Sequence, residues 1–156
     1  MQHISLASCG SAPEISSEID RLCERKLIPE DFNTPNICKK IAEFFASDMG
    51  RKICGSNNVL REFKFSVLTD SAQLGLDLQD EKILLQGVVD FALLEADGIT
   101  ILDYKTDSLH GTDVSTVIGK YKSQLNAYAD ALSRIFKMPI KSKQIYFFSA
   151  GLFAEV

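Results

Sequence analysis

Two apolar segments joined by Asp97-Gly98 constrain the fold of this chain more than any other feature of its sequence. The first, Lys82–Leu94, is a nearly continuous apolar run (KILLQGVVDFALL), and the second covers Ile99–Tyr104. Such a run is typical of a strand that is covered on both faces, and Asp-Gly between two apolar runs is a strong signal for a tight β-hairpin. The sequence therefore predicts a hairpin inside a buried sheet.

The other segments show the spacing of helices or of further strands. Apolar residues recur at helical intervals in three segments, alternate in one and form a short run in another. In chain order we expect helices over residues 13–26 and 35–49, a strand over 59–68, the hairpin, a helix over 112–136 and a strand over 144–149. The expected architecture is one α/β domain with a mixed central sheet, whose N-terminal helical part covers residues 1–54 and whose core covers residues 55–156.

Composition excludes several classes of protein. A chain of 156 residues that is 46% hydrophobic can bury one core without staples. No apolar run reaches the roughly 18 residues that would span a bilayer, and no secretory signal is recognisable, so we expect a cytoplasmic location. The four cysteines lack the spacing of a zinc site and are expected to be reduced thiols. The formal net charge of −4 indicates that any contact with nucleic acid is local.

Two aspartates interrupt the apolar hairpin segments. Asp90 lies in VVDFALL and Asp103 in ITILDYK, and burying an ionised carboxylate is costly unless it is paired or bound to a metal. If Asp97-Gly98 forms the two-residue turn, the numbers of opposed residues sum to 195, so Asp90 faces Lys105 and Asp103 faces Ala92. Because side chains alternate along strands, Asp90, Asp103 and Lys105 would then project from the same face.

Two carboxylates and one ammonium group in that arrangement favour a hard divalent cation. Mg²⁺ takes a few carboxylate oxygens and keeps several waters, which leaves positions for a phosphate oxygen and an attacking water. Lys105 would stabilise the charge that develops on phosphorus. The alternative is a cross-strand salt bridge between Asp90 and Lys105 in a purely structural domain. The acid-x-Lys string alone decides nothing, since Glu62-Phe63-Lys64 has it as well.

Three further polar residues are candidates for the same site. Gln124 and Tyr128 are four residues apart on the apolar stripe of the predicted helix, so they share a face. An amide on a buried stripe needs a partner, which beside a metal site could be a phosphate, a base or Lys105; alternatively Tyr128 belongs to the core and Gln124 borders it. Glu62 is either a solvated residue of its strand or a third carboxylate ligand, directly or through water.

Together these residues resemble a known family. Glu62 in REFKF, Gly87-Val88-Val89-Asp90, Asp103-Tyr104-Lys105-Thr106-Asp107 and Gln124-x-x-x-Tyr128 resemble the PD-(D/E)xK nuclease superfamily, most closely the RecB-type nuclease domains at the C-terminus of AddA-family helicase-nucleases. The resemblance implies a restriction-endonuclease-like core and a metal-dependent deoxyribonuclease, an exonuclease or an endonuclease, acting in double-strand break repair and recombination. It also implies that Asp90, Asp103 and the backbone carbonyl of Tyr104 bind Mg²⁺ or Mn²⁺, that Lys105 is the catalytic lysine, and that Gln124 and Tyr128 form the QxxxY motif of the family.

The resemblance also sets expectations about partners and about the extent of the chain. It implies DNA as the substrate, fed as a single strand from a helicase motor in the rest of the parent polypeptide, with an AddB-type partner subunit. Some relatives hold an iron-sulfur cluster through cysteines on both sides of the core; here all four cysteines precede it, so no cluster is expected. The metal-binding histidine of the family lies upstream of the part matched by this chain and is not His3. We therefore expect a fragment that cuts DNA poorly until the upstream helix is restored, with a non-catalytic module for DNA guidance or subunit contact as the alternative.

Overall fold

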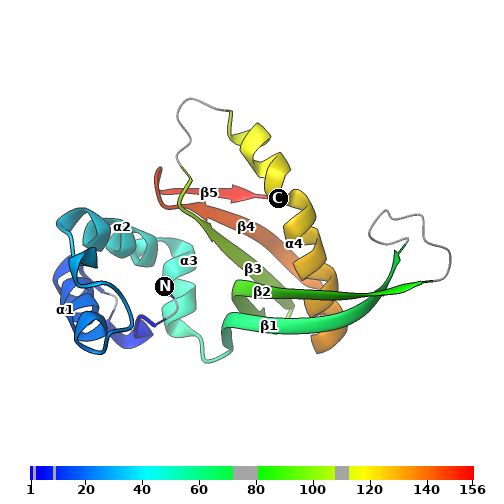
Figure 1. Cartoon of the computed structure of the whole chain (residues 1–156), viewed down its shortest axis with the longest axis horizontal. Helices are drawn as coiled ribbons and strands as arrows, with labels where there is room; N and C mark the ends of the chain where they lie inside the picture. Colours follow the sequence, from blue (N-terminus) through cyan, green and yellow to red (C-terminus); the bar gives the residue numbers. More distant parts are fainter. Residues whose placement is uncertain (2, 9, 72–80, 108–112) are drawn as a thin grey trace.

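The computed structural model describes residues 1, 3–8, 10–71, 81–107 and 113–156, and shows a helical part followed by a five-stranded sheet (Figure 1). In chain order the elements are η1 (Leu6–Ser8), α1 (Ala12–Glu24), η2 (Glu30–Phe32), α2 (Pro35–Ala46), α3 (Asp48–Gly55), β1 (Val59–Asp70), β2 (Lys82–Glu95), β3 (Gly98–Lys105), α4 (Val114–Phe136), β4 (Ile140–Phe147) and β5 (Leu152–Glu155). The predicted α/β class with a mixed sheet is confirmed.

The sheet lies between two helical layers. Its strand order is β1-β2-β3-β4-β5, and only the β3–β4 pair is parallel. Helix α4 connects these two strands and packs along one face, where Tyr128 and Leu132 meet Val89 and Ile101. Helices α1, α2 and α3 pack on the other side, where Phe44 of α2 lies in one cluster with residues of β2, β3 and β4. The middle of the sheet is therefore covered on both faces.

The two predicted N-terminal helices form, but the second is interrupted. Ser11 and Thr34 cap α1 and α2 by accepting hydrogen bonds from the backbone N–H groups of Glu14 and Ile37. The prediction of one helix over residues 35–49 is wrong, because Ser47 ends α2 and its hydroxyl accepts from the N–H of Gly50 to begin α3. Gly50 lies inside α3, where an added Cβ would come within 2.3 Å of the carbonyl oxygen of Phe44. Only glycine allows the two helices to approach so closely.

The hairpin of β2 and β3 has a different register from the predicted one. Glu95 pairs with Gly98 and Ala92 with Ile101, so the turn is Ala96-Asp97 and the prediction that Asp103 faces Ala92 is wrong. Gly98 is needed as the first residue of β3 instead of in the turn, because it adopts a φ of +147° and a Cβ there would lie 2.8 Å from the carbonyl oxygen of Pro139. The shift moves the register by two residues, and the ladder ends at the pair Phe91–Leu102, so the prediction that Asp90 faces Lys105 is wrong as well.

Two other predictions about strands need correction. The outer part of β2 is not covered on both faces: β1 and β2 extend together beyond the rest of the sheet (Figure 1), and Leu84 of β2 is 55% exposed. Strand β5, which pairs antiparallel with β4, was not predicted. The predicted helix over residues 112–136 is observed as α4, although its first residue lies outside the described residues.

The cysteines and the helices bear on the zinc-binding, disulfide-bonded and membrane-spanning classes considered above. Cys23, Cys38 and Cys54 are not joined in disulfides, and Cys9 lies outside the described residues. Among the helices in the part of the chain that the structure describes, none is both long and apolar enough to cross a membrane.

Gly87 provides a stability prediction for the contact between β2 and α4. A Cβ at this position would lie 2.7 Å from the ring of Phe65 and 3.2 Å from that of Tyr128, and both rings are buried. We expect Gly87→Ala to destabilise the fold by about 1–3 kcal/mol through overpacking. The matched control is Gly119→Ala on the exposed side of α4, which meets no atom within 4 Å and should stabilise the helix by up to about 1 kcal/mol. Urea unfolding measures both, and equal effects would contradict the packing argument.

Candidate active site

Asp90 lies at a gap in the hydrogen-bonded ladders on both sides of β2. Within the described strands, the pairing of β1 with β2 omits only Glu62 and Asp90, between the pairs Arg61–Phe91 and Phe63–Val89. The ladder of β2 with β3 ends at Phe91. Beyond Phe91, the side chain of Asp90 replaces the backbone contacts between β2 and β3: its Oδ2 accepts a hydrogen bond of 2.9 Å from the backbone N–H of Tyr104. Asp90 thus holds β3 with one oxygen, at the point where the strands separate.

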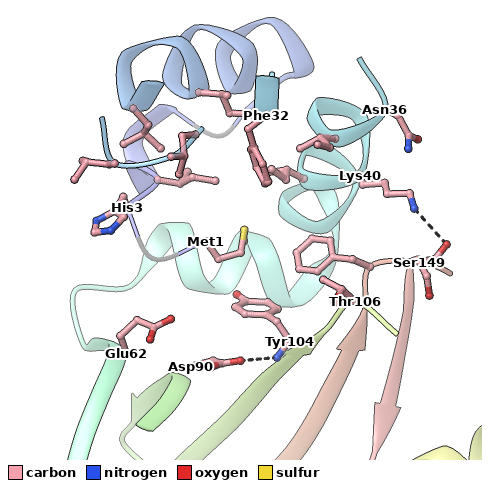
Figure 2. Close-up of a pocket in the computed structure, with 18 residues that line it drawn as sticks. Met1, His3, Phe32, Asn36, Lys40, Glu62, Asp90, Tyr104, Thr106 and Ser149 are labelled. Carbon is pink, nitrogen blue, oxygen red and sulfur yellow. Dashed lines mark hydrogen bonds between the residues drawn. The ribbon is translucent and has the colours of Figure 1, made fainter. Parts of the chain in front are cut away.

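Glu62 lies across the gap from Asp90 and has an unusual backbone conformation. Its φ of +50° falls in the left-handed region, which non-glycine residues rarely adopt inside a strand. Glu62 and Asp90 both line a cavity between the sheet and the N-terminal helices (Figure 2). Strained backbone of this kind concentrates at functional sites. It therefore supports Glu62 as a residue of the active site more strongly than its position in the strand pattern did.

Asp103 and Lys105 project toward α4 from β3. Asp103 is only 2% exposed, and the Nζ of Lys105 lies 2.7 Å from its Oδ2. The ion pair therefore joins these two residues, and the alternative of an Asp90–Lys105 salt bridge is not what the structure shows. Apart from this ammonium group, no donor among the described residues reaches the Oδ2. A buried carboxylate oxygen in that condition is suited to an additional cation.

Helix α4 contributes a short chain of polar contacts to Lys105. Gln124 places its Oε1 3.5 Å from the Nζ of Lys105, and its Nε2 donates a 2.6 Å hydrogen bond to the Oη of Tyr128. The predicted common face of Gln124 and Tyr128 is therefore confirmed, and the contact with Lys105 is one of the three partners considered for the amide. Tyr128 also packs in the core, edge-on to the ring of Phe65.

Sequence reasoning missed the place of Tyr121 at this site. Its ring lies 4.4 Å from the Nζ of Lys105, in cation–π geometry, and its hydroxyl donates a 2.8 Å hydrogen bond to Oδ2 of Asp107. In the sequence it is one more residue of the apolar stripe of the helix. The available signal was its spacing, because a residue three before Gln124 lies on the same face of the helix.

Tyr104 contacts Asp90 through its backbone and the N-terminal helices through its ring. Its backbone N–H binds Asp90, while its ring packs against Phe44 in the cluster beneath the N-terminal helices. Burial raises the pKa of its hydroxyl, and the nearby charge of Asp90 adds to that shift. His3 lies at the same cavity as Tyr104, on its exposed rim.

Burial dominates the electrostatics of Asp103. It raises the pKa of the carboxyl, the ammonium group of Lys105 lowers it, and the negative charge of Asp90 raises it again. A bound cation would offset both unfavourable contributions to the charged form. The donor set present is suited to Mg²⁺ or Mn²⁺, since it consists of carboxylate oxygens. Among the described residues no group of three His, Cys, Asp or Glu side chains could hold a metal ion, so backbone oxygen and water would have to complete the shell around two aspartates.

Comparisons with known proteins agree with this arrangement. The sequence profile of the PD-(D/E)XK nuclease superfamily matches residues 3–153. An ATP-dependent helicase/nuclease subunit of Bacillus licheniformis is 35% identical over 97% of this chain and 13% of its own length. The protein of the same name from Clostridium botulinum strain Langeland is 34% identical over 100% of this chain and 12% of its own length. The chain thus spans about an eighth of the length of these relatives.

The profile match includes both aspartates, Lys105 and the α4 residues that contact it, and it covers nearly the whole fold. With a mixed five-stranded sheet and flanking helices, the chain belongs to the PD-(D/E)XK nuclease superfamily.

Proposed function

We propose that this chain hydrolyses phosphodiester bonds in DNA with a divalent cation held by Asp90 and Asp103. The observation that carries the proposal is the interaction of the buried Asp103 carboxylate with both Lys105 and Asp90, near the point where β2 and β3 separate. The superfamily supports a hydrolytic nuclease as the enzyme class and disfavours the alternative of a non-catalytic module.

Each residue of the site has a proposed role. Asp90 and Asp103, with the backbone carbonyl of Tyr104, would hold Mg²⁺ or Mn²⁺, and Glu62 would contribute through water. When bound, such a cation lowers the pKa of a coordinated water and polarises the phosphoryl group. The Nζ of Lys105 would donate a hydrogen bond to a phosphate oxygen and stabilise the negative charge that develops there.

Gln124, Tyr128 and Tyr121 would position Lys105 for this role. The Oε1 of Gln124 faces the ammonium group, Tyr128 fixes the orientation of the amide, and the Tyr121 ring lies against the same ammonium group. A lysine held from several sides loses less conformational entropy when it contacts the phosphate.

The proposal extends to the setting in which the domain works. We propose that it belongs to a longer helicase-nuclease with an AddB-type partner subunit, acting in the cytoplasm in double-strand break repair and recombination. The similarity to ATP-dependent helicase/nuclease proteins supports this setting. A net charge of −4 provides little general attraction for a phosphate backbone, which supports a single strand delivered by the rest of the polypeptide.

Metal-linked stability tests the proposed site without requiring cleavage. We expect Mg²⁺ or Mn²⁺ to raise the melting temperature of the wild-type chain, because a ligand that binds only the folded state adds about 2.7 kcal/mol at a hundredfold excess over its Kd. Calorimetric titration should give a Kd for wild type and no binding for a variant with both Asp90→Asn and Asp103→Asn. A cleavage assay in the same cations, with EDTA as the control, tests the activity. Equal melting temperatures with and without metal would contradict the proposed site.

A further inference from the structure

A cavity of about 640 Å³ opens beside Asp90, on the side of the sheet opposite α4. Its walls come from α1, η2 and α2 on one side and, on the other, from Glu62 of β1, Asp90 of β2, the end of β3 and the residues that follow β4 (Figure 2). The volume falls in the range of about 300–1,000 Å³ that is usual for small-ligand pockets. Because Asp90 and Glu62 line it, the cavity borders one of the two aspartates of the candidate metal site.

Most of the lining is apolar, and part of it is aromatic. Tyr104 and Phe148 form an aromatic wall, with ring centroids 5.5 Å apart. Phe32 and Leu27 lie at the same cavity and are 41% and 45% exposed, although large apolar side chains usually avoid water. An apolar and partly aromatic surface that stays open to solvent favours a flat apolar ligand.

The polar groups of the cavity are concentrated at two edges. Asp90 and Glu62 lie at the edge next to the candidate metal site, and Asn36 and Lys40 lie on the α2 side (Figure 2). The Nζ of Lys40 is 3.5 Å from the carbonyl oxygen of Ser149. A ligand that enters the cavity would thus have carboxylates and a bound cation at one end and an ammonium group at the other. Phosphates fit both ends and an apolar moiety fits the middle.

The hydroxyl of Tyr104 provides a second, independent sign of a ligand. This buried oxygen has no hydrogen-bond partner among the described residues, and the ring that carries it lines the cavity beneath Met1 (Figure 2). A buried hydroxyl without a partner costs free energy that a bound polar edge would recover. A nucleobase has such an edge around a flat apolar face.

We infer that this cavity binds an unpaired nucleobase of the DNA strand, next to the phosphodiester bond that is cut. The inference rests on the proposed nuclease function and adds a subsite to it. The base stacks against the wall of Tyr104 and Phe148, and Lys40 meets the phosphate on the far side of that nucleotide. A base in a duplex would first have to leave its stack, which is costly, so the cavity selects single strands.

Fluorescence of a base analogue tests occupancy directly. A single-stranded oligodeoxynucleotide carrying one 2-aminopurine is bound in Ca²⁺, whose less regular coordination we expect to allow binding without cleavage. Moving the 2-aminopurine along the strand should show a fluorescence change confined to one position. Ile37→Trp, which fills the cavity from α2, and Phe32→Ala, which removes an exposed ring, should both reduce that change. Leu84→Ala, at a 55% exposed residue of the distant β1–β2 extension, is the matched control and should leave it intact.

The same subsite can be tested through cleavage rates by combining an abasic substrate with the cavity-filling substitution Ile37→Trp. An abasic site at the sensitive position should lower the kcat/KM of the wild-type chain about tenfold, the scale of one stacked base. In Ile37→Trp the base is already excluded, so the abasic site should cause less than about a twofold further loss, since two changes that remove one interaction are not additive.

The possible results separate the two proposals. Equal abasic penalties in wild type and Ile37→Trp would overturn the base subsite while cleavage remains. Absence of cleavage by wild type in both Mg²⁺ and Mn²⁺ would overturn the proposed function, and the fluorescence experiment would then decide the subsite alone. A fluorescence change that is independent of position, or that Ile37→Trp leaves unaltered, would show that the cavity receives something else, such as an apolar protein segment.

Discussion

Replacing Asp103 by alanine should abolish metal-dependent cleavage and leave the fold nearly as stable as before. Asp103 is buried near Asp90, and the ammonium group of Lys105 is the one donor that reaches its Oδ2 among the described residues, so we expect it to be a main ligand of the cation. Bound metal contributes several kcal/mol to stabilisation of the transition state, and each 1.4 kcal/mol or so is a factor of ten in rate. A loss of at least about a thousandfold in turnover should follow in single-turnover cleavage assays.

The expected stability of Asp103→Ala follows from the pKa of the carboxyl. Because burial raises that pKa, the folded chain binds the proton more tightly than the unfolded chain does. Without metal, the free energy of unfolding of the wild type should therefore fall as the pH rises from about 4 through the folded-state pKa. Asp103→Ala removes this dependence, so its unfolding free energy should stay within about 1 kcal/mol of wild type at neutral pH.

Urea unfolding of both proteins at acidic and neutral pH, without metal, measures this difference. Asp103→Asn is the isosteric control, since it keeps the shape of the side chain but cannot ionise. If Asp103→Ala unfolds the domain and metal does not change the unfolding free energy of wild type, Asp103 has a structural role, and the proposed metal site is wrong.

Replacing Lys105 by alanine should separate metal binding from catalysis. Its ammonium group lies 2.7 Å from Oδ2 of Asp103, so its removal takes a positive charge away from the site that would hold the cation. We expect the affinity for Mg²⁺ to be unchanged or higher in calorimetric titration. Turnover should fall by about 10²–10³, the usual scale for loss of one electrostatic contact in the transition state.

Lys64→Ala is the matched control for Lys105→Ala. It removes the lysine of the same acid-x-Lys pattern, Glu62-Phe63-Lys64, from an exposed position on β1. Turnover of this variant should equal that of wild type. Loss of metal binding in Lys105→Ala would show that the lysine supports the aspartates and has a different role from the proposed one.

The common face of Asp103 and Lys105 was predictable because it depends only on the alternation of side chains along one strand. Asp90 was predicted on that face as well, but it lines the cavity on the opposite side of the sheet, where the β1–β2 ladder is interrupted at Glu62 and Asp90. The exact partners depend on tertiary contacts that a local pattern does not contain. Gly98 must fit beside Pro139, which is more than forty residues away in the sequence.

Other errors have the same origin. The stripe of apolar residues over 35–49 has one period, and nothing in it reveals that the Ser47 hydroxyl would interrupt the helix. The sequence places Tyr121 only on the apolar stripe of its helix, because periodicity identifies the face of a helix and not the residues that the face contacts. Its contact with Lys105 arises only when α4 is packed against β3.

The two aspartates should differ in how replaceable they are. Asp90 holds the end of β3 through the N–H of Tyr104, at a point where both neighbouring ladders are interrupted, whereas Asp103 has no such duty toward the backbone among the contacts described. Asparagine at position 90 could still accept that hydrogen bond, and alanine could not. In a lineage that no longer needed to cut DNA, we therefore expect Lys105 and Asp103 to be substituted earlier than Asp90. Position 90 would keep an Asp or Asn long after catalysis had been lost, because the hydrogen bond to Tyr104 would still be needed to hold β3.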